Sequence, residues 1–375
     1  MKVLVIADTT DVKCGWGRYA FEVVSHLEKQ GMSCIILTSA ASQTERQSPI
    51  SDEHAILLPF TFRNTIKNFF KIRRFITRDV SVIHSFDVWP FALYAYLANW
   101  GKGKPLFMTG VGTYSIPPAN NGLKTRLMRL LYARAKEVFC ISNYTLDLIR
   151  TRVSKANLSV VYWGASSLPH PNEVDKQRLS EYINIPKDRW PIILTVGQIK
   201  HRKGQLDTLK AIQLLKPKYP NILYLTMGGT GDNKYVGQVK DFAKKEGLED
   251  NLHIFNNQKT DQELAFFYDS CDLYAMNSNN EGVHYEGFGL VFIEAAQFGK
   301  PSIGSKGCGI EDAIVDGETG FLTVQGDHVD IADKIGRLLS SDIKKFGKAA
   351  QTRAKNFTWT KTVNQYVEAY NKYLK

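Results

Sequence analysis

The strongest constraint on the fold is an alternation of short apolar runs with helical segments, which occurs twice along the chain. Runs of apolar, β-branched residues separated by helices predict a parallel sheet covered on both faces. The first series spans residues 2–162 and the second begins at residue 192. Between them, residues 164–190 break the rhythm with three prolines among polar residues. We therefore expect an α/β protein with two Rossmann-like, doubly wound domains in tandem.

The break also predicts the domain boundaries. We expect residues 1–170 to form an amino-terminal domain, 171–190 a linker and 191–356 a carboxy-terminal domain, because 375 residues exceed one ordinary core. The predicted strands span residues 2–8, 33–39, 80–86, 105–109, 137–142, 158–162, 192–196, 222–227, 252–255, 272–276 and 301–304. Ligands of such sheets bind outside the carboxyl ends of the strands, so two facing sheets predict an interdomain cleft for two substrates.

The charge is unevenly distributed between the two halves. Residues 1–170 hold 21 Lys and Arg against 11 Asp and Glu, whereas the remainder holds 27 against 26. A basic half predicts an anionic partner for the first domain, either nucleic acid or a membrane surface. The five cysteines are scattered and include no CxxC pair, and neither a secretory signal nor a membrane span is evident. These features predict a cytoplasmic protein.

The most informative motif is a glycine-rich turn that leads into a predicted helix, from Glu286 through Gly287, Phe288, Gly289 and Leu290 to Glu294. Backbone N–H groups at a helix start bind anions, and glycines let a ligand approach the main chain. Two carboxylates about two turns apart are suited to grip hydroxyl groups of one polar ligand. Taken alone, the spacing fits an ordinary turn with solvated glutamates better.

Three further loops follow predicted strands. The segment Gly197–Gly204 carries Gln198, Arg202 and Lys203 and suits a diphosphate, although a solvated basic loop is equally compatible. The segment Gly15–Arg18 holds Trp16 and Gly17, and Trp16 would either stack on a sugar or cover the turn. The glycine-rich loop 228–231 is a weak signal of the same kind.

Together these motifs resemble the retaining glycosyltransferases of family 4, which have the GT-B fold of two facing Rossmann domains. The two glutamates match a family motif in which seven residues separate them. The resemblance also covers the segments 307–311 and 316–322 and the closing Phe357–Thr360. From that closing segment, the family's last helix, residues 357–375 here, returns to the first domain.

The resemblance implies a role for each matching residue. Glu286 is expected to contact the donor sugar, Glu294 the ribose and Lys203 the diphosphate, with Arg202 as a second cation. The donor-binding residues implied are Gly17, Gln198, Gln258, Lys259, Gly287, Phe288, Gly289, Leu290 and Glu294. Gln258 and Lys259 would lie near the base. Trp16, His84 and Tyr114 are expected on the acceptor side, although a lone histidine at a strand end is more often structural.

Two departures from the family pattern affect the expected contacts. Gln198 stands where the family often has arginine, and Arg202 is the proposed replacement. The stretch Thr109–Tyr114 contains no histidine, whereas the family often carries a His-Gly pair there. The resemblance therefore implies no contact of a histidine from this stretch with the donor sugar.

The chemistry implied is transfer of a hexose from a UDP- or GDP-sugar to a glycan or lipid-linked acceptor, with retention of configuration. The sequence contains no Asp-x-Asp motif and no metal-ligand spacing, so we expect no metal and stabilisation of the leaving diphosphate by Lys203, Arg202 and amides. The setting would be synthesis of cell-surface polysaccharide, such as lipopolysaccharide, or of glycolipid. A nucleotide-sugar epimerase and a non-catalytic glycan-binding homologue are the alternatives.

Two basic, amphipathic segments of the first half predict contact with a membrane. Residues 61–78 hold six basic residues and no acidic one, and residues 123–136 hold five and none. Such helices suit anionic lipid, which predicts a peripheral protein on the inner face of the plasma membrane. Ordinary core-facing helices with solvated faces are the alternative. No nucleic-acid-binding module is recognised, so nucleic acid is not an expected partner.

Overall fold

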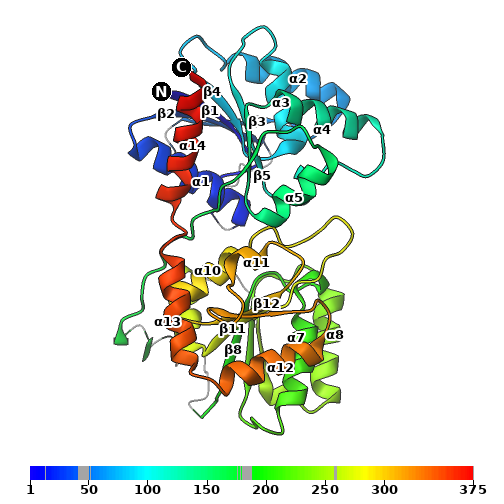
Figure 1. The fold of residues 1–375 in the computed structure, drawn as a ribbon, viewed down its shortest axis with the longest axis vertical. Helices are drawn as coiled ribbons and strands as arrows, with labels where there is room; N and C mark the ends of the chain where they lie inside the picture. The colour runs from blue at the N-terminus through cyan, green and yellow to red at the C-terminus, as the bar shows by residue number, and fades with distance from the viewer. Residues whose placement is uncertain are drawn as a thin grey trace. The chain divides into compact units, whose positions relative to one another are not determined.

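A computed structural model describes residues 1–12, 14–40, 50, 52–174, 176–177, 179, 188–256 and 260–374 (Figure 1). The chain divides into two compact units, Met1–Gly164 with Thr358–Lys375, and Ala165–Phe357. The boundary therefore falls a few residues before the predicted one, and the predicted linker 171–190 belongs to the second unit. Positions 175, 178 and 180–187 of that linker lie outside the described residues.

The first unit is built on a parallel sheet of strand order β3-β2-β1-β4-β5-β6-β7. Its strands are β1 (Lys2–Ile6), β2 (Ser33–Ser39), β3 (Glu53–Leu57), β4 (Val82–Ser85), β5 (Leu106–Gly110), β6 (Glu137–Cys140) and β7 (Leu158–Val160). Its helices are α1 (Gly15–Lys29), α2 (Phe62–Arg73), α3 (Leu93–Ala98), α4 (Leu123–Arg134), α5 (Asn143–Arg152) and α14 (Trp359–Leu374), with short turns η2 (Val88–Ala92) and η3 (Thr113–Ser115). Strands β1 and β4 are fully buried apart from Lys2, as a sheet covered on both faces requires.

The last helix, α14, packs in the first unit beside α1, although more than 300 residues separate them in sequence (Figure 1). The hydroxyl of Tyr19 in α1 lies 3.2 Å from that of Tyr366 in α14. The ring of Tyr19 also stacks on Trp163, which lies outside both helices, at 4.2 Å between ring centroids. A Cβ on Gly164 would lie 2.1 Å from the backbone nitrogen of Trp359, so only glycine allows this approach.

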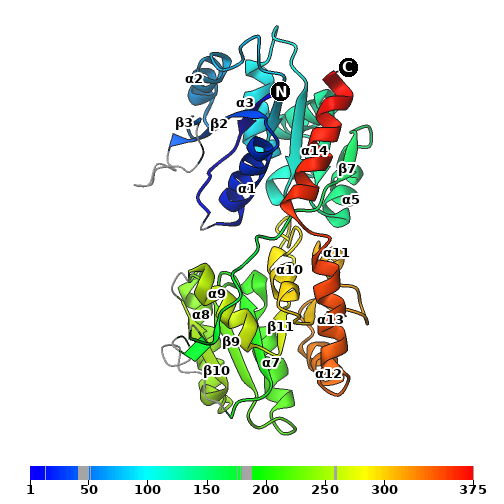
Figure 2. The same ribbon diagram turned by 90° about the vertical axis from the view of Figure 1, so that its left-hand side faces the viewer.

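The second unit is built on a parallel sheet of order β10-β9-β8-β11-β12-β13. Its strands are β8 (Ile192–Val196), β9 (Leu223–Met227), β10 (Leu252–Phe255), β11 (Leu273–Met276), β12 (Ser302–Ser305) and β13 (Gly320–Thr323). Its helices are α7 (Gln205–Leu215), α8 (Asn233–Lys245), α9 (Asp261–Ser270), α10 (Leu290–Gln297), α11 (Ile310–Ala313), α12 (His328–Leu339) and α13 (Ile343–Ala354), with turns η4 (His201–Lys203) and η5 (Glu249–Asn251). Figure 2 shows α10 beside α13.

Both sheets have the strand order of a Rossmann fold. The chain first adds strands on one side of a central strand and then returns to add strands on its other side. The fold expected from the sequence is therefore confirmed for each unit. No helix among the described residues is long and apolar enough to cross a membrane.

Candidate functional site

The topology of the second sheet brings two distant loops together. Strands β8 and β11 are neighbours, and the chain leaves β8 towards β9 on one side and reaches β11 on the other. The carboxyl ends of such a strand pair form the switch point where ligands of open α/β sheets bind. The loop after β8 carries Arg202 and Lys203, and the loop after β11 carries Glu286.

Close backbone contacts fix the first of these loops. Gly204 has a φ of +68°, and a Cβ there would lie 1.9 Å from the carbonyl oxygen of Asn277. The amide of Asn279 also donates to the carbonyl of Arg202 at 2.8 Å. The two loops are therefore held by main-chain geometry, which fixes the directions from which Arg202 and Lys203 approach the site.

The centre of the site is a carboxylate held by two cations. Glu286 accepts a hydrogen bond from Nζ of Lys203 at 2.6 Å and from a guanidinium nitrogen of Arg202 at 3.2 Å. All three side chains are less than one fifth exposed. Burial raises the pKa of Glu286, but Lys203 and then Arg202 outweigh it and hold the pKa below its usual value. The carboxylate is thus ionised and carries one negative charge against two positive ones.

The glycine-rich turn leads from Glu286 into α10, as expected from the sequence. Gly289 adopts a φ of +84° and is the N-cap, but no side chain caps the helix. The amide of Gly309 donates to the carbonyl of Glu286 at 2.8 Å, and a Cβ on Gly309 would lie 1.9 Å from the carbonyl oxygen of Gly287. The helix start that holds Leu290 is therefore free of a side-chain acceptor and offers its amides to an anion. Phe288 is buried in this turn.

The second glutamate of the motif lies along the same helix. Glu294 is partly buried and accepts a hydrogen bond from the hydroxyl of Tyr268 at 2.8 Å. Burial, followed by the charge of Glu294, raises the pKa of Tyr268 well above its usual value, so this hydroxyl remains a donor. Tyr268 thereby fixes one carboxylate oxygen and orients the side chain.

The loop after β9 completes this edge of the sheet. Ile199 donates from its amide to the carbonyl of Gly229 at 3.0 Å, and a Cβ on Gly228 would lie 2.1 Å from the carbonyl oxygen of Gly197. Close packing of two backbones explains Gly228. Gln258 and Lys259, expected near the base, lie outside the described residues.

In the first unit, Gly17 and Trp16 lie in the first turn of α1. A Cβ on Gly17 would lie 2.1 Å from the carbonyl oxygen of Asp11, so glycine is required for packing. Its amide donates to Sγ of Cys14 at 3.4 Å, a weak N-cap contact. Trp16 is half-buried, and Tyr114 in η3 is 55% exposed.

His84 does not lie where an acceptor contact requires it. The side chain is completely buried, with Nδ1 2.6 Å from the hydroxyl of Tyr370 and Nε2 2.9 Å from Oγ1 of Thr109. Burial lowers the pKa of His84 to about 3, so the ring is neutral. The structure therefore favours the structural alternative, in which His84 joins β4 and β5 to α14, and we withdraw His84 from the acceptor side.

Comparison with known proteins identifies the family. Residues 14–166 match the family model described as glycosyltransferase family 4, and residues 175–357 match the model described as glycosyl transferases group 1. The chain belongs to the family 4-like glycosyltransferases and has the GT-B fold. The expected resemblance is thereby confirmed.

Solved structures show the same fold over the whole glycosyltransferase. A glycosyltransferase from Rickettsia africae has a TM-score of 0.83 and 20% identity, and covers 100% of this chain and 98% of its own. HepE from Anabaena, solved with UDP-glucose, has a TM-score of 0.80 and 17% identity, and covers 99% of this chain and 100% of its own.

Sequence relatives are more similar but match only in part. D-inositol 3-phosphate glycosyltransferases from Corynebacterium aurimucosum and Corynebacterium glutamicum are 28% and 30% identical over 60% and 57% of this glycosyltransferase. The matches span 54% and 51% of those relatives, about half of their length.

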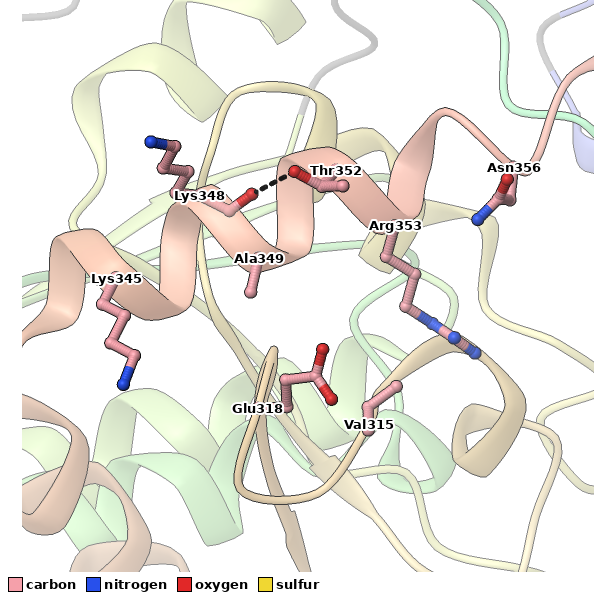
Figure 3. Close-up of a pocket in the computed structure, with 8 residues that line it drawn as sticks. All are labelled: Val315, Glu318, Lys345, Lys348, Ala349, Thr352, Arg353 and Asn356. Atoms are coloured by element: carbon pink, nitrogen blue, oxygen red, sulfur yellow. Dashed lines mark hydrogen bonds between the residues drawn. The ribbon is translucent and has the colours of Figure 1, made fainter.

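A separate cavity of the glycosyltransferase lies away from these loops. It measures about 450 Å³ and lies between α13 and the loop after α11. Figure 3 shows the carboxylate of Glu318 beneath Ala349 of α13, with Lys345 and Arg353 on either side. No residue expected to bind donor or acceptor lines it. The guanidinium of Arg353 already donates hydrogen bonds to the carbonyls of Asp312 and Ala313.

Two charged residues near strand ends were not singled out from the sequence. Lys200 lies within the basic loop after β8, and its Nζ donates to Oε1 of Gln198 at 2.9 Å. Asp87, after β4, is buried and accepts hydrogen bonds from the amide of Val88 and the hydroxyl of Ser115, at 2.7 and 2.9 Å. Each follows a predicted strand at its carboxyl end, which is the signal that would have drawn attention to them.

Among the described residues, no group of three or more His, Cys, Asp and Glu side chains is arranged to hold a metal ion.

Proposed function

We propose that the chain transfers a hexose, with retention of configuration, from a UDP- or GDP-sugar to a glycan or lipid-linked acceptor. The observation that carries the proposal is the contact of Glu286 with Lys203 and Arg202 beside the start of α10. Departure of a nucleoside diphosphate builds negative charge on phosphate oxygens, and fixed cations and amides stabilise such charge. The Anabaena neighbour, solved with UDP-glucose, supports a nucleotide-sugar donor.

We assign a separate part of the donor to each residue of the site. Lys203, Arg202 and the amides of the first turn of α10 would bind the diphosphate, Glu286 the sugar hydroxyls and Glu294 the ribose. Positive charge from the protein itself makes a metal unnecessary, so we propose metal-independent transfer. In the first unit, Trp16 and Tyr114 remain proposed acceptor contacts, because both retain exposed surface.

A membrane surface is the proposed location of the acceptor. Phe62, Ile66 and Phe70 are 85%, 49% and 59% exposed and lie four residues apart along α2. Residues four apart share one face of a helix, and exposed Arg63 and Lys67 adjoin that face. An exposed apolar stripe flanked by cations suits anionic lipid. The same segment also buries Ile72 and Ile76 in the core. The alternative of a core-facing helix therefore describes the face that carries these two residues, and not the face that carries Phe62, Ile66 and Phe70.

The same surface determines the setting that we propose. The protein would act peripherally on the inner face of the plasma membrane, in synthesis of cell-surface polysaccharide, such as lipopolysaccharide, or of glycolipid. The carboxyl edge of the first sheet would then receive an acceptor carried by the lipid.

A thermal-shift screen tests the donor site. UDP, GDP, ADP and their sugars are added to the whole chain, since a ligand that binds only the folded state raises the melting temperature. At least one nucleoside diphosphate is expected to raise it by several degrees in wild type and by much less in Lys203→Ala. Equal shifts in both proteins, or no shift with any nucleotide, would overturn the assignment.

A further inference from the structure

Among the described residues, no carboxylate lies within salt-bridge distance of Lys200, a cation of the basic loop after β8. Lys200 is partly buried, and its Nζ donates to the neutral carboxamide of Gln198. In the described part of the chain, the other basic residues of the loop do have acidic partners: His201 contacts Glu281 at 2.6 Å, and Arg202 and Lys203 share Glu286. Lys200 therefore differs from its neighbours.

The charges around Lys200 leave this part of the site positive. Burial, then Arg202 and Lys203, lower the pKa of Lys200, and the opposing effects of Glu286 and Glu281 are weaker. Three basic residues, Lys200, Arg202 and Lys203, thus lie in this loop, and only Arg202 and Lys203 contact the buried carboxylate of Glu286. Partly buried cations with excess charge are stabilised by an anionic ligand, and a diphosphate supplies the two or more charges needed here.

Two neighbouring segments place Gln198, the residue that contacts Lys200. Gln198, which orients the ammonium, lies against the loop after β9, where a Cβ on Gly231 would meet the Gln198 side chain at 3.5 Å. The carbonyl of Gln198 in turn accepts a hydrogen bond from the side chain of Gln205 at 3.1 Å. The main chain of Gln198 is therefore held by α7, and its exposed side chain lies beside the glycine loop, where it accepts the hydrogen bond from Lys200.

We propose that Lys200 is a third cation of the donor diphosphate site and that Gln198 is the positioning residue that holds it. The inference rests on the proposed donor site but adds residues to it, since Gln198 supplies no charge itself. In this arrangement Lys200 delivers the positive charge that Gln198 lacks, while Lys203 and Arg202 act beside Glu286.

Calorimetric titration of the whole chain with UDP and with UMP tests this role. Lys200→Met is expected to weaken UDP binding by roughly tenfold or more, since a charge-assisted contact is lost, and UMP binding by less. Lys200→Arg keeps the charge and should stay within about threefold of wild type. Lys240→Met, on the exposed face of α8, is the matched control and should bind as wild type does.

The double variant Gln198→Arg with Lys200→Met separates charge from local structure, because it returns a cation to the same place. It should recover most of the lost UDP affinity, and every variant should melt within a few degrees of wild type. UDP binding by Lys200→Met within about threefold of wild type, or equal losses for UDP and UMP, would overturn the role of Lys200 while leaving the donor site intact. If wild type binds GDP in place of UDP, the same comparison uses GDP and GMP. Failure of wild type to bind UDP, GDP and ADP would refute the donor site itself.

Discussion

The carboxylate of Glu286 lies 2.6 Å from the ammonium of Lys203, across 83 residues of sequence. The residue proposed to hold the donor sugar is therefore paired with a cation proposed to hold the donor diphosphate. A bound diphosphate and Glu286 would compete for Lys203 and Arg202. This competition would weaken the binding of the leaving diphosphate by the two cations, and the same two cations keep Glu286 ionised.

Replacing Glu286 with glutamine should separate binding from transfer. Because the competing charge is removed, Glu286→Gln is expected to bind UDP more tightly than wild type, by up to about tenfold. Transfer should fall by roughly 100-fold or more, since a contact to the reacting sugar is lost. Calorimetry and a turnover assay measure the two effects. Glu281→Gln, which removes an exposed carboxylate paired with His201, should change neither by more than about threefold. Weaker UDP binding by Glu286→Gln would contradict the competition.

Chelation tests the proposal that no metal takes part. Lys203, Arg202 and the α10 amides provide the positive charge that a metal ion would otherwise supply. Turnover in the presence of EDTA should therefore equal turnover in its absence. Lys203→Ala should lose activity under both conditions. If EDTA abolishes turnover and added Mg²⁺ or Mn²⁺ restores it, metal-independent transfer is refuted.

The exposed stripe on α2 should determine membrane binding. We expect the chain to float with vesicles that contain anionic lipid and to do so less as salt increases. Phe62→Ser with Phe70→Ser should reduce the bound fraction several-fold, because apolar area no longer enters the lipid. Leu214→Ser with Val329→Ser removes similarly exposed residues from the second unit and is the control. No flotation of wild type at moderate salt would exclude the membrane surface.

Asp87 predicts a pH dependence of stability. Burial raises the pKa of Asp87 to about 7, although the contacts with Val88 and Ser115 lower it and Asp8 and Lys124 act in opposite senses. An unfolded Asp has a pKa near 3.8. Between these values the folded chain binds one more proton than the unfolded chain, so this stabilisation is lost progressively as pH rises from about 4 to about 7.

Asp87→Asn should remove that dependence, because the amide stays neutral and its oxygen can still accept both hydrogen bonds. The variant should be more stable than wild type at pH 8, on the order of 4 kcal/mol, and similar to it only near pH 4. Thermal unfolding across this range is the measurement. Asp147→Asn, which alters an exposed helix pair, should follow wild type. Parallel pH profiles for Asp87→Asn and wild type would disprove the assignment.

The sequence predicted the elements with strong apolar patterns best. Strand β2 spans the predicted residues 33–39, because Cys34–Leu37 are a continuous apolar run in a buried strand. Strand β3 was missed, since Glu53–Leu57 is short, half-buried and preceded by polar residues. After β4 the chain forms η2 and then α3, and Trp89 within η2 has an extended backbone conformation that no local pattern predicts.

For the site, the sequence predicted which loops matter but not their contacts. The order of strands β8 and β11 explains why Lys203 meets Glu286, yet nothing in either segment states that the two side chains pair. The same applies to Lys200, whose partner is neutral Gln198, and to His84, whose burial depends on α14 some 286 residues away. Tertiary packing determines these side-chain contacts, and the local sequence pattern contains no information about it.

The most direct test of the central claim is proton NMR of the nucleotide sugar that stabilises the chain most, followed over time with the whole protein. Slow transfer to water should release the nucleoside diphosphate and a free sugar that first appears with the anomeric configuration of the donor. Lys203→Ala and Glu286→Ala should lose this release. Conversion of the nucleotide sugar to an isomer without release of diphosphate would contradict transfer and support an epimerase. Binding without any turnover across a panel of acceptors would also contradict transfer and would support a non-catalytic glycan-binding protein.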